Sequence, residues 1–104
     1  MSDTPVYVVA NFIVHDADTY REYEKGFFLI LKRHEGNFFT YDDNTVTFEG
    51  ASPREGRMVM FGFPSEAHAT AWFNDPGYQA LSEHRRAGTT LQFLTMVHGL
   101  PPRD

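Results

Sequence analysis

The sequence predicts an α+β fold in which four strands and two helical regions follow one another in the order βαββαβ. Four segments are rich in β-branched and aromatic residues, which is typical of strands. Two longer segments carry apolar residues at helical spacing. This order is that of the ferredoxin-like arrangement, so we expect a four-stranded antiparallel sheet. A chain of 104 residues suits one domain, and we expect residues 1–104 to form a single domain of this type.

The first strand is expected at residues 6–14, VYVVANFIV, where apolar side chains stand on both faces. A helix should follow, beginning at Asp16 or Asp18 and ending at Gly36. Gly26 inside this helix costs about 1 kcal/mol relative to Ala, unless it allows close packing. The residues expected on its apolar face recur every three or four positions: Tyr20, Tyr23, Phe27, Ile30 or Leu31, and His34.

The next two strands are expected at residues 37–49 and 57–63. The first of them contains three turn-forming residues in a row, Asp42, Asp43 and Asn44, which predict a turn or bulge within it. The second, RMVMFGF, is again apolar on both faces.

The second helical region is expected to begin at Ser65, a good N-cap residue. Asp75 and Pro76 should break it and start a last short helix, because proline is well tolerated at the first helical position. The final strand is expected at residues 89–98, TTLQFLTMVH.

Right-handed crossovers place the first and third strands in the centre of such a sheet. Those are the two strands that are apolar on both faces, so the pattern and the topology agree. Two helical regions cover only one face of a four-stranded sheet, and a large exposed apolar face is costly. We therefore expect a homodimer in which the open sheet face meets a second copy of the same sheet.

The composition argues against several classes of function. The net charge is -5 with no basic run, which argues against nucleic-acid binding. There are no cysteines, and the five histidines show no metal-binding spacing, so we expect no metal site. No basic N-terminal region precedes an apolar run, and no apolar stretch approaches 18 residues, so a cytoplasmic protein without a membrane partner is expected.

Several short motifs follow one another along the chain. They are a tyrosine-containing first strand, an Asp-x-x-x-Tyr-x-x-Tyr helix start, Phe-Pro-Ser, Ala-x-x-Trp-Phe, an Asp-Pro turn, and Tyr-Gln-Ala-Leu ahead of arginine. With them the chain resembles the family catalogued as domain of unknown function 1330. The resemblance implies a dimeric α+β barrel, the superfamily of heme-degrading and quinol monooxygenases, muconolactone isomerases and stress-responsive barrel proteins. It implies a fold and a dimer more strongly than a function, because one fold hosts many chemistries.

Heme degradation is one activity that this resemblance suggests and that the residues can test. Heme-degrading members of the superfamily combine an Asn on the first strand with a Trp and a His on the second helical region. Asn11 and Trp72 match this pattern, but the matching histidine position is Ser82. His84 comes two residues later, which turns its side chain by about 200° around a helix. We therefore expect no heme.

The binding site of such a barrel is expected between the sheet and the helices, or inside the barrel. His34 could move a proton near neutral pH, or it could only complement the helix dipole. Arg85 would be costly in an apolar pocket unless it meets an anionic ligand or pairs with a carboxylate such as Glu22 or Glu24. The candidate ligand-binding residues are Tyr7, Asn11, Tyr20, Phe61, Trp72, Tyr78 and Arg85.

Two functions remain open from the sequence. The first is an enzyme or binder for a small aromatic or acidic metabolite, of the cofactor-free monooxygenase or isomerase type, with neither metal nor flavin. The second is a non-catalytic dimeric module that senses a ligand or takes part in a stress response. A cavity in which Asn11 and Arg85 converge would favour the first, and an ion-paired Arg85 against a closed core would favour the second.

Overall fold

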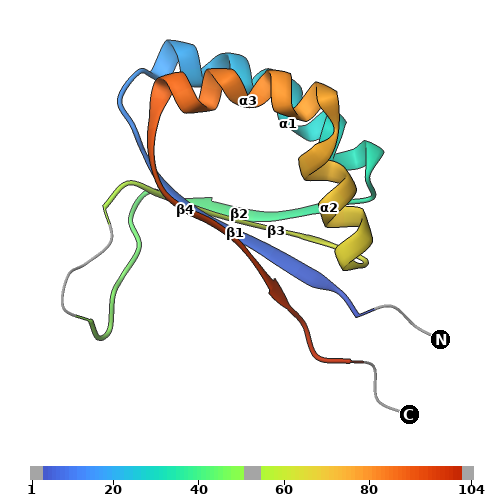
Figure 1. Ribbon diagram of the computed structural model, residues 1–104. Coiled ribbons are helices and arrows are strands. Elements are labelled where there is room, and N and C mark those ends of the chain that lie inside the picture. The colour runs from blue at the N-terminus through green and yellow to red at the C-terminus, as the bar shows by residue number, and fades with distance from the viewer. Residues whose placement is uncertain (1–3, 51–54, 102–104) are drawn as a thin grey trace.

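The computed structural model describes residues 4–50 and 55–101, and it has the predicted βαββαβ order with the second helical region divided in two. The elements are β1 (Val6–Val14), α1 (Ala17–Arg33), β2 (Asn37–Asp42), β3 (Arg57–Phe63), α2 (Glu66–Asn74), α3 (Pro76–Gly88) and β4 (Thr89–His98). The strands form one sheet in the order β2-β3-β1-β4, and every neighbouring pair is antiparallel. The helices cover one face of this sheet (Figure 1). The fold is therefore ferredoxin-like, with β1 and β3 in the centre as predicted.

Helix α1 begins as the sequence predicted but ends differently. Asp16 is its N-cap, and the carboxylate accepts a hydrogen bond from the backbone N–H of Thr19 at 3.1 Å. At the other end Glu35, and not Gly36, adopts the left-handed conformation, with φ of 61°. A Cβ at Gly36 would lie 2.4 Å from Leu31 Cδ1, so this glycine is needed for close packing and not for its backbone freedom.

The prediction that the second strand continues to residue 49 is wrong beyond Asp42. The side chain of Asp42 accepts a hydrogen bond at 2.8 Å from the backbone N–H of Asn44, which closes a tight turn and ends β2. The turn predicted at Asp42, Asp43 and Asn44 is therefore present, and a separate irregularity in the pairing of β2 lies earlier, between Phe38 and Thr40. After the turn the chain forms an arm that extends away from the sheet (Figure 1), and Phe48 on this arm is almost fully exposed.

The core between the helices and the sheet is built mainly from aromatic rings. The apolar face of α1 is buried as its spacing predicted, with Tyr20, Tyr23, Phe27, Ile30 and Leu31 all inside. The ring of Phe61 lies between those of Phe27 and Trp72, at centroid distances of 5.3 and 5.1 Å. A Cβ at Gly26 would lie 3.0 Å from Leu81, which shows how closely α1 approaches α3.

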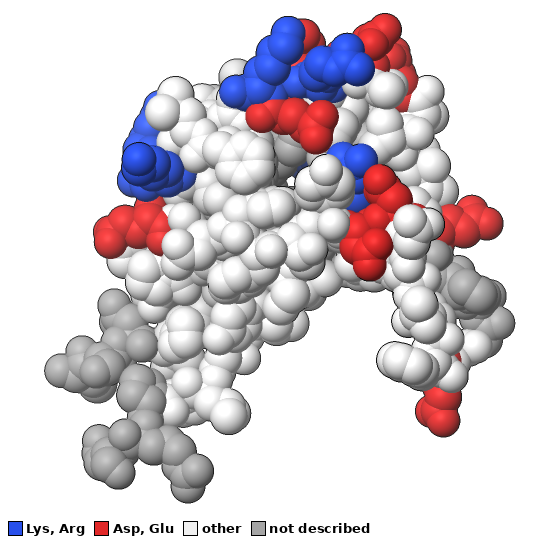
Figure 2. Space-filling model, turned by 180° about the vertical axis from the view of Figure 1, so that it is seen from behind, with Lys and Arg blue, Asp and Glu red and all other residues white. Residues whose placement is uncertain are grey.

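The opposite face of the sheet has no helix over it and is largely apolar. Tyr7 and Phe39 are in ring contact there, and Phe39, Met60 and Val97 are 49%, 36% and 45% exposed. On the side of the molecule seen in Figure 2, most charged side chains lie over the helices, and the surface below them is largely uncharged. Among the described residues, no helix is long and apolar enough to cross a membrane.

Candidate ligand-binding site

A cavity of about 80 Å³ lies between the sheet and helices α1 and α3, and we call it the inner cavity. Its polar residues are Glu24, Arg57 and Arg85, together with three tyrosines. The rest of its wall is apolar. Its aromatic lining is Phe12, Tyr20, Tyr23, Phe27, Phe28, Phe38, Tyr41 and Phe61.

A larger hollow of about 460 Å³, the outer groove, lies between helices α2 and α3 and strand β4. Its lining includes Trp72 and Phe73 from α2 and Thr95 and Met96 from β4. Arg85 contributes to the walls of both the inner cavity and the outer groove. A volume of this size is in the range of small-molecule sites.

Arg85 is the only buried arginine or lysine among the described residues, with 4% of its surface exposed. Its Nε and Nη1 atoms have no hydrogen-bond partner, and no ion pair involves it within residues 4–50 and 55–101. Its guanidinium lies 5.8 Å from the centre of the Tyr23 ring. The expected alternative, a carboxylate partner such as Glu22 or Glu24, is not found: those two carboxylates bind Lys25 and Arg57. An unpaired buried cation is costly, so this position favours an anionic ligand.

Helix α3 holds Arg85 in place through its own backbone. Asp75 caps the helix start by accepting from the N–H of Gly77 at 2.8 Å, and Pro76 occupies the first helical position. At the other end, the hydroxyl of Thr89 donates to the carbonyl of Arg85 at 2.6 Å. The residues of α3 that face inward are Tyr78, Ser82, Arg85 and Gly88, which recur every three or four positions.

Tyr23 and Tyr78 form a buried pair beside Arg85. Their hydroxyl oxygens lie 2.8 Å apart, and the Tyr78 ring packs on Trp72 at a centroid distance of 4.1 Å. Burial raises the pKa of the Tyr23 hydroxyl well above its ordinary value of 10.0. Burial also raises the pKa of Tyr20, to about 12. Both hydroxyls are therefore protonated at neutral pH.

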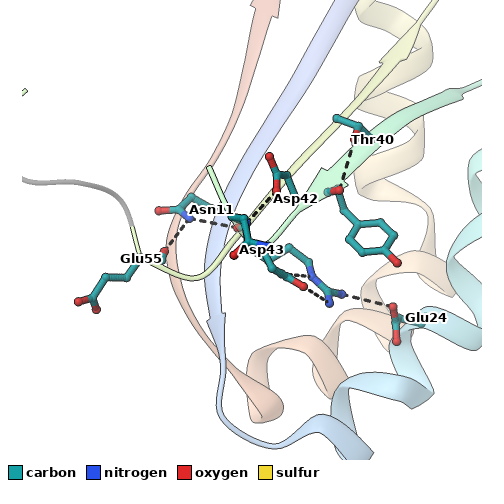
Figure 3. A network of polar contacts seen from close by, with 9 residues as sticks. Asn11, Glu24, Thr40, Asp42, Asp43 and Glu55 are labelled. Carbon is teal, nitrogen blue, oxygen red and sulfur yellow. Dashed lines mark hydrogen bonds and ion pairs between the residues drawn. The ribbon is translucent and has the colours of Figure 1, made fainter. Parts of the chain in front are cut away.

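Arg57 lines the inner cavity and belongs to a network of polar contacts with Asp43 and Glu24, two residues that Figure 3 labels. Its Nε and Nη2 donate to the two carboxylate oxygens of Asp43 at 2.9 and 3.1 Å, and Glu24 is 3.5 Å away. Its guanidinium also lies 4.5 Å from the centre of the Tyr41 ring. This hydrogen bonding holds the pKa of Asp43 below its usual value. Arg57 is thus already neutralised by the protein, in contrast to Arg85.

The structure brings most of the predicted ligand-binding residues together. Tyr20, Phe61 and Arg85 line the inner cavity, and Trp72 lines the outer groove. Tyr78 lies against Tyr23 and Trp72 without lining either space. Trp72 Nε1 is buried and has no hydrogen-bond partner among the described residues.

Three further predicted residues, Tyr7, Asn11 and His34, also line neither space. Asn11 alternates with the cavity-lining Ala10 and so lies on the opposite face of the sheet, where its Nδ2 donates to the carbonyls of Glu55 and Arg57 at 3.0 and 3.1 Å (Figure 3). The expected convergence of Asn11 with Arg85 is therefore not observed.

Tyr7 shares the open face of the sheet and contacts Phe39. His34 caps the end of α1, where its Nε2 lies 2.7 Å from Asp75 Oδ2. The sequence left open either proton transfer or complementing the helix dipole for His34, and it did not anticipate this hydrogen bond to Asp75.

Tyr23 and Arg57 are among the residues of the site that were not selected from the sequence. Tyr23 was interpreted as part of a packed stripe, because nothing in its spacing separates it from the other buried rings. Arg57 was assigned only to a strand, and its position at the cavity depends on the turn at Asp43. An arginine at the start of an otherwise apolar strand is the one signal that could have identified it.

The histidines of the described residues form no metal site. No group of three or more His, Asp or Glu side chains there could hold a metal ion. The register of β1 and β4 also keeps His15 and His98 apart. His98 pairs with Val6, whereas His15 follows Val14, at the other end of β1.

Comparison with known proteins supports the fold. The family model for domain of unknown function 1330 matches residues 5–100. No curated protein matches the chain. A structure of RPA0582, a protein of unknown function from Rhodopseudomonas palustris, has a TM-score of 0.74 at 16% identity, covering 96% of this chain and 85% of that one.

Two further solved structures are similar at comparable coverage. SnoaB from Streptomyces nogalater, a cofactor-independent oxygenase, has a TM-score of 0.63 at 14% identity, covering 97% of this chain and 95% of that one. A dimeric ferredoxin-like protein of unknown function from Thermobifida fusca has a TM-score of 0.53 at 13% identity, with 92% and 90% coverage. At such identities the likeness shows the fold alone.

Proposed function

The chain belongs to the family of domain of unknown function 1330, and from its own site we propose that it binds a small acidic metabolite with an aromatic or otherwise apolar body. The observation that carries this proposal is Arg85. Its guanidinium is buried and unpaired within the described residues, and it forms part of the wall of both hollow spaces. An anionic group of the ligand would satisfy the free N–H donors, and the surrounding rings would contact its apolar body.

A more specific proposal is that the protein also converts this ligand chemically, without metal or flavin. The similarity to SnoaB supports it at the level of the fold. The composition of the inner cavity favours the alternative, a module that senses a ligand without converting it. Among the described residues, no histidine lines that cavity, and Glu24 is the one carboxylate in its wall and is held by Arg57. General base catalysis would need a freer proton acceptor in this position.

We also propose that the protein is a homodimer through the open face of its sheet. This face carries exposed apolar side chains, among them Phe39, Met60 and Val97. A second copy offers the same apolar face, and a two-fold axis makes such a surface complementary to itself. The ferredoxin-like structure from Thermobifida fusca, which is described as dimeric, supports a dimer but does not bear on which face forms it.

Ligand binding is tested with the purified protein and one-ring carboxylates such as benzoate and salicylate. Calorimetry and thermal unfolding should show binding to the wild type, because a ligand of the native state raises the melting temperature. Arg85→Gln should weaken binding by about tenfold or more, since it removes the charged partner of a buried anion. Arg21→Ala is the matched control, because Arg21 is exposed on α1 and its one ion pair within residues 4–50 and 55–101 is with Asp18. Equal binding by both variants would contradict the assignment of Arg85.

A further inference from the structure

The Tyr23–Tyr78 pair holds one proton more than its own hydrogen bond uses. The two hydroxyls are 2.8 Å apart, and either one can be the donor. Two hydroxyl groups carry two protons, and their mutual bond uses one of them. Within residues 4–50 and 55–101 no other acceptor is hydrogen-bonded to either hydroxyl. Since Tyr23 lines the inner cavity, the remaining proton can be donated into it when Tyr78 donates to Tyr23.

Arg85 adds further donors at the same place. Its Nε and Nη1 have no partner among the described residues, and its guanidinium lies beside the Tyr23 ring. Side-chain acceptors are scarce by comparison: the one carboxylate that lines the inner cavity, Glu24, is engaged by Arg57. A site with free donors and engaged acceptors fits a ligand oxygen that accepts several hydrogen bonds.

The charges around the pair favour a negative ligand oxygen. The cation of Arg57 on β3 is balanced by Asp43 and Glu24, whereas the cation of Arg85 on α3 has no such partner in the described chain. The remaining titratable neighbours in the cavity wall are Tyr20 on α1 and Tyr41 on β2. Burial raises the pKa of both Tyr20 and Tyr23, so these hydroxyls stay protonated and act as donors.

We propose that Tyr23, Tyr78 and Arg85 form a site for an ionised ligand oxygen, and that it binds weakly acidic phenols or enols and holds them deprotonated. Tyr78 donates to Tyr23, Tyr23 donates to the ligand oxygen, and the Arg85 cation compensates its charge. This inference rests on the proposed anion site and names the class of ligand that it takes. The proton that the ligand loses goes to solvent, and no bond other than O–H is broken.

The test uses 4-nitrophenol, a one-ring phenol whose deprotonated form is coloured, titrated with pH in the presence and absence of the protein. Bound 4-nitrophenol should ionise at a pH lower by about one unit or more, as expected for an acid next to an opposite charge. 4-Nitroanisole has the same ring without the acidic proton, and it should bind at least about tenfold more weakly. Tyr23→Phe and Tyr78→Phe should each reduce the shift, Arg85→Gln should abolish it, and Arg21→Ala should leave it unchanged.

The outcomes separate this inference from the proposed function. Benzoate is already ionised at neutral pH, so it tests the anion site without testing deprotonation. If benzoate binds and 4-nitrophenol shows an unshifted titration, or no binding at all, the inference is overturned and the anion site stands. If neither benzoate nor 4-nitrophenol binds to the folded wild type, both are overturned. Since the wild-type titration decides the matter, a variant that fails to fold does not remove the test.

Discussion

Gly36 is packed against two side chains of the core, and its lack of a Cβ is what allows this contact. A Cβ there would lie 2.4 Å from Leu31 Cδ1 and 2.9 Å from Phe63 Cε1, and both residues are buried. Gly36→Ala should therefore destabilise the protein by about 1–3 kcal/mol, the usual range for overpacking a core. Urea unfolding followed by tryptophan fluorescence measures the change in the free energy of unfolding.

The same substitution in a Leu31→Ala background is the control for this explanation. Leu31→Ala removes the nearest atoms, so Gly36→Ala should then cost less, with a coupling energy of about 0.5–3 kcal/mol between the two sites. Equal costs in the two backgrounds would show that the steric account of Gly36 is wrong.

For individual residues, the sequence predicted which side chains face inward better than it predicted what those side chains contact. The sequence selected Tyr78 and Arg85 as candidates for a site inside the molecule, and both are buried residues of α3. It could not show that Arg85 is unpaired, because that depends on which carboxylates other elements bring near. For the same reason Asn11 was a reasonable polar marker on β1, although alternation along the strand places it on the face away from the cavity.

The junction between α2 and α3 depends on one carboxylate. Asp75 ends α2, caps α3, and accepts from His34 at the end of α1 at 2.7 Å and from Arg33 at 3.0 Å. The hydrogen bond from His34 and the N–H of Gly77 lower the pKa of Asp75 from 3.8 to about 2. The ionised form therefore stabilises the fold above about pH 4, and this stabilisation is lost as pH falls through about 2.

Asp75→Asn should lower the melting temperature at neutral pH, and its difference from the wild type should shrink as pH falls from about 4 to about 2. Thermal unfolding followed by circular dichroism at a series of pH values measures this. Asp18→Asn is the control, because Asp18 is 90% exposed and pairs only with the exposed Arg21, so its melting temperature should change little. A difference for Asp75→Asn that stays constant down to pH 2 would refute a role for its charge.

Among the elements, the prediction was wrong where a side chain competed with strand pairing. The end of the second predicted strand, TVTFE, has high β-propensity, and propensity alone extended the strand to residue 49. The Asp42 side chain instead bonds the backbone of Asn44 and turns the chain away before those residues can pair. Elements with strong caps, such as Asp16 for α1 and Ser65 for α2, began where the sequence predicted.

For the whole molecule, the open sheet face leads to a prediction about assembly. Sedimentation or light scattering should show a dimer, and Met60→Glu should shift it toward monomer, because it places a charge within the proposed apolar interface. Leu29→Glu is the matched control: Leu29 is 70% exposed on α1, in the helical layer, and its substitution should leave the dimer intact. A monomeric wild type would overturn the proposed interface.

The register of β1 also bears on how the chain is made. β1 lies between β3 and β4, and Val6 near its start pairs with His98 near the end of β4. A ribosome releases the N-terminal strand first, yet that strand gains its second neighbour only after β4, the last of the described elements, has emerged. The sheet therefore closes only after β4 has been synthesised, and until then the nascent chain carries one of its most apolar segments unshielded. Such a polypeptide depends on rapid closure, or on chaperones that bind apolar strands, in the interval between translation and folding.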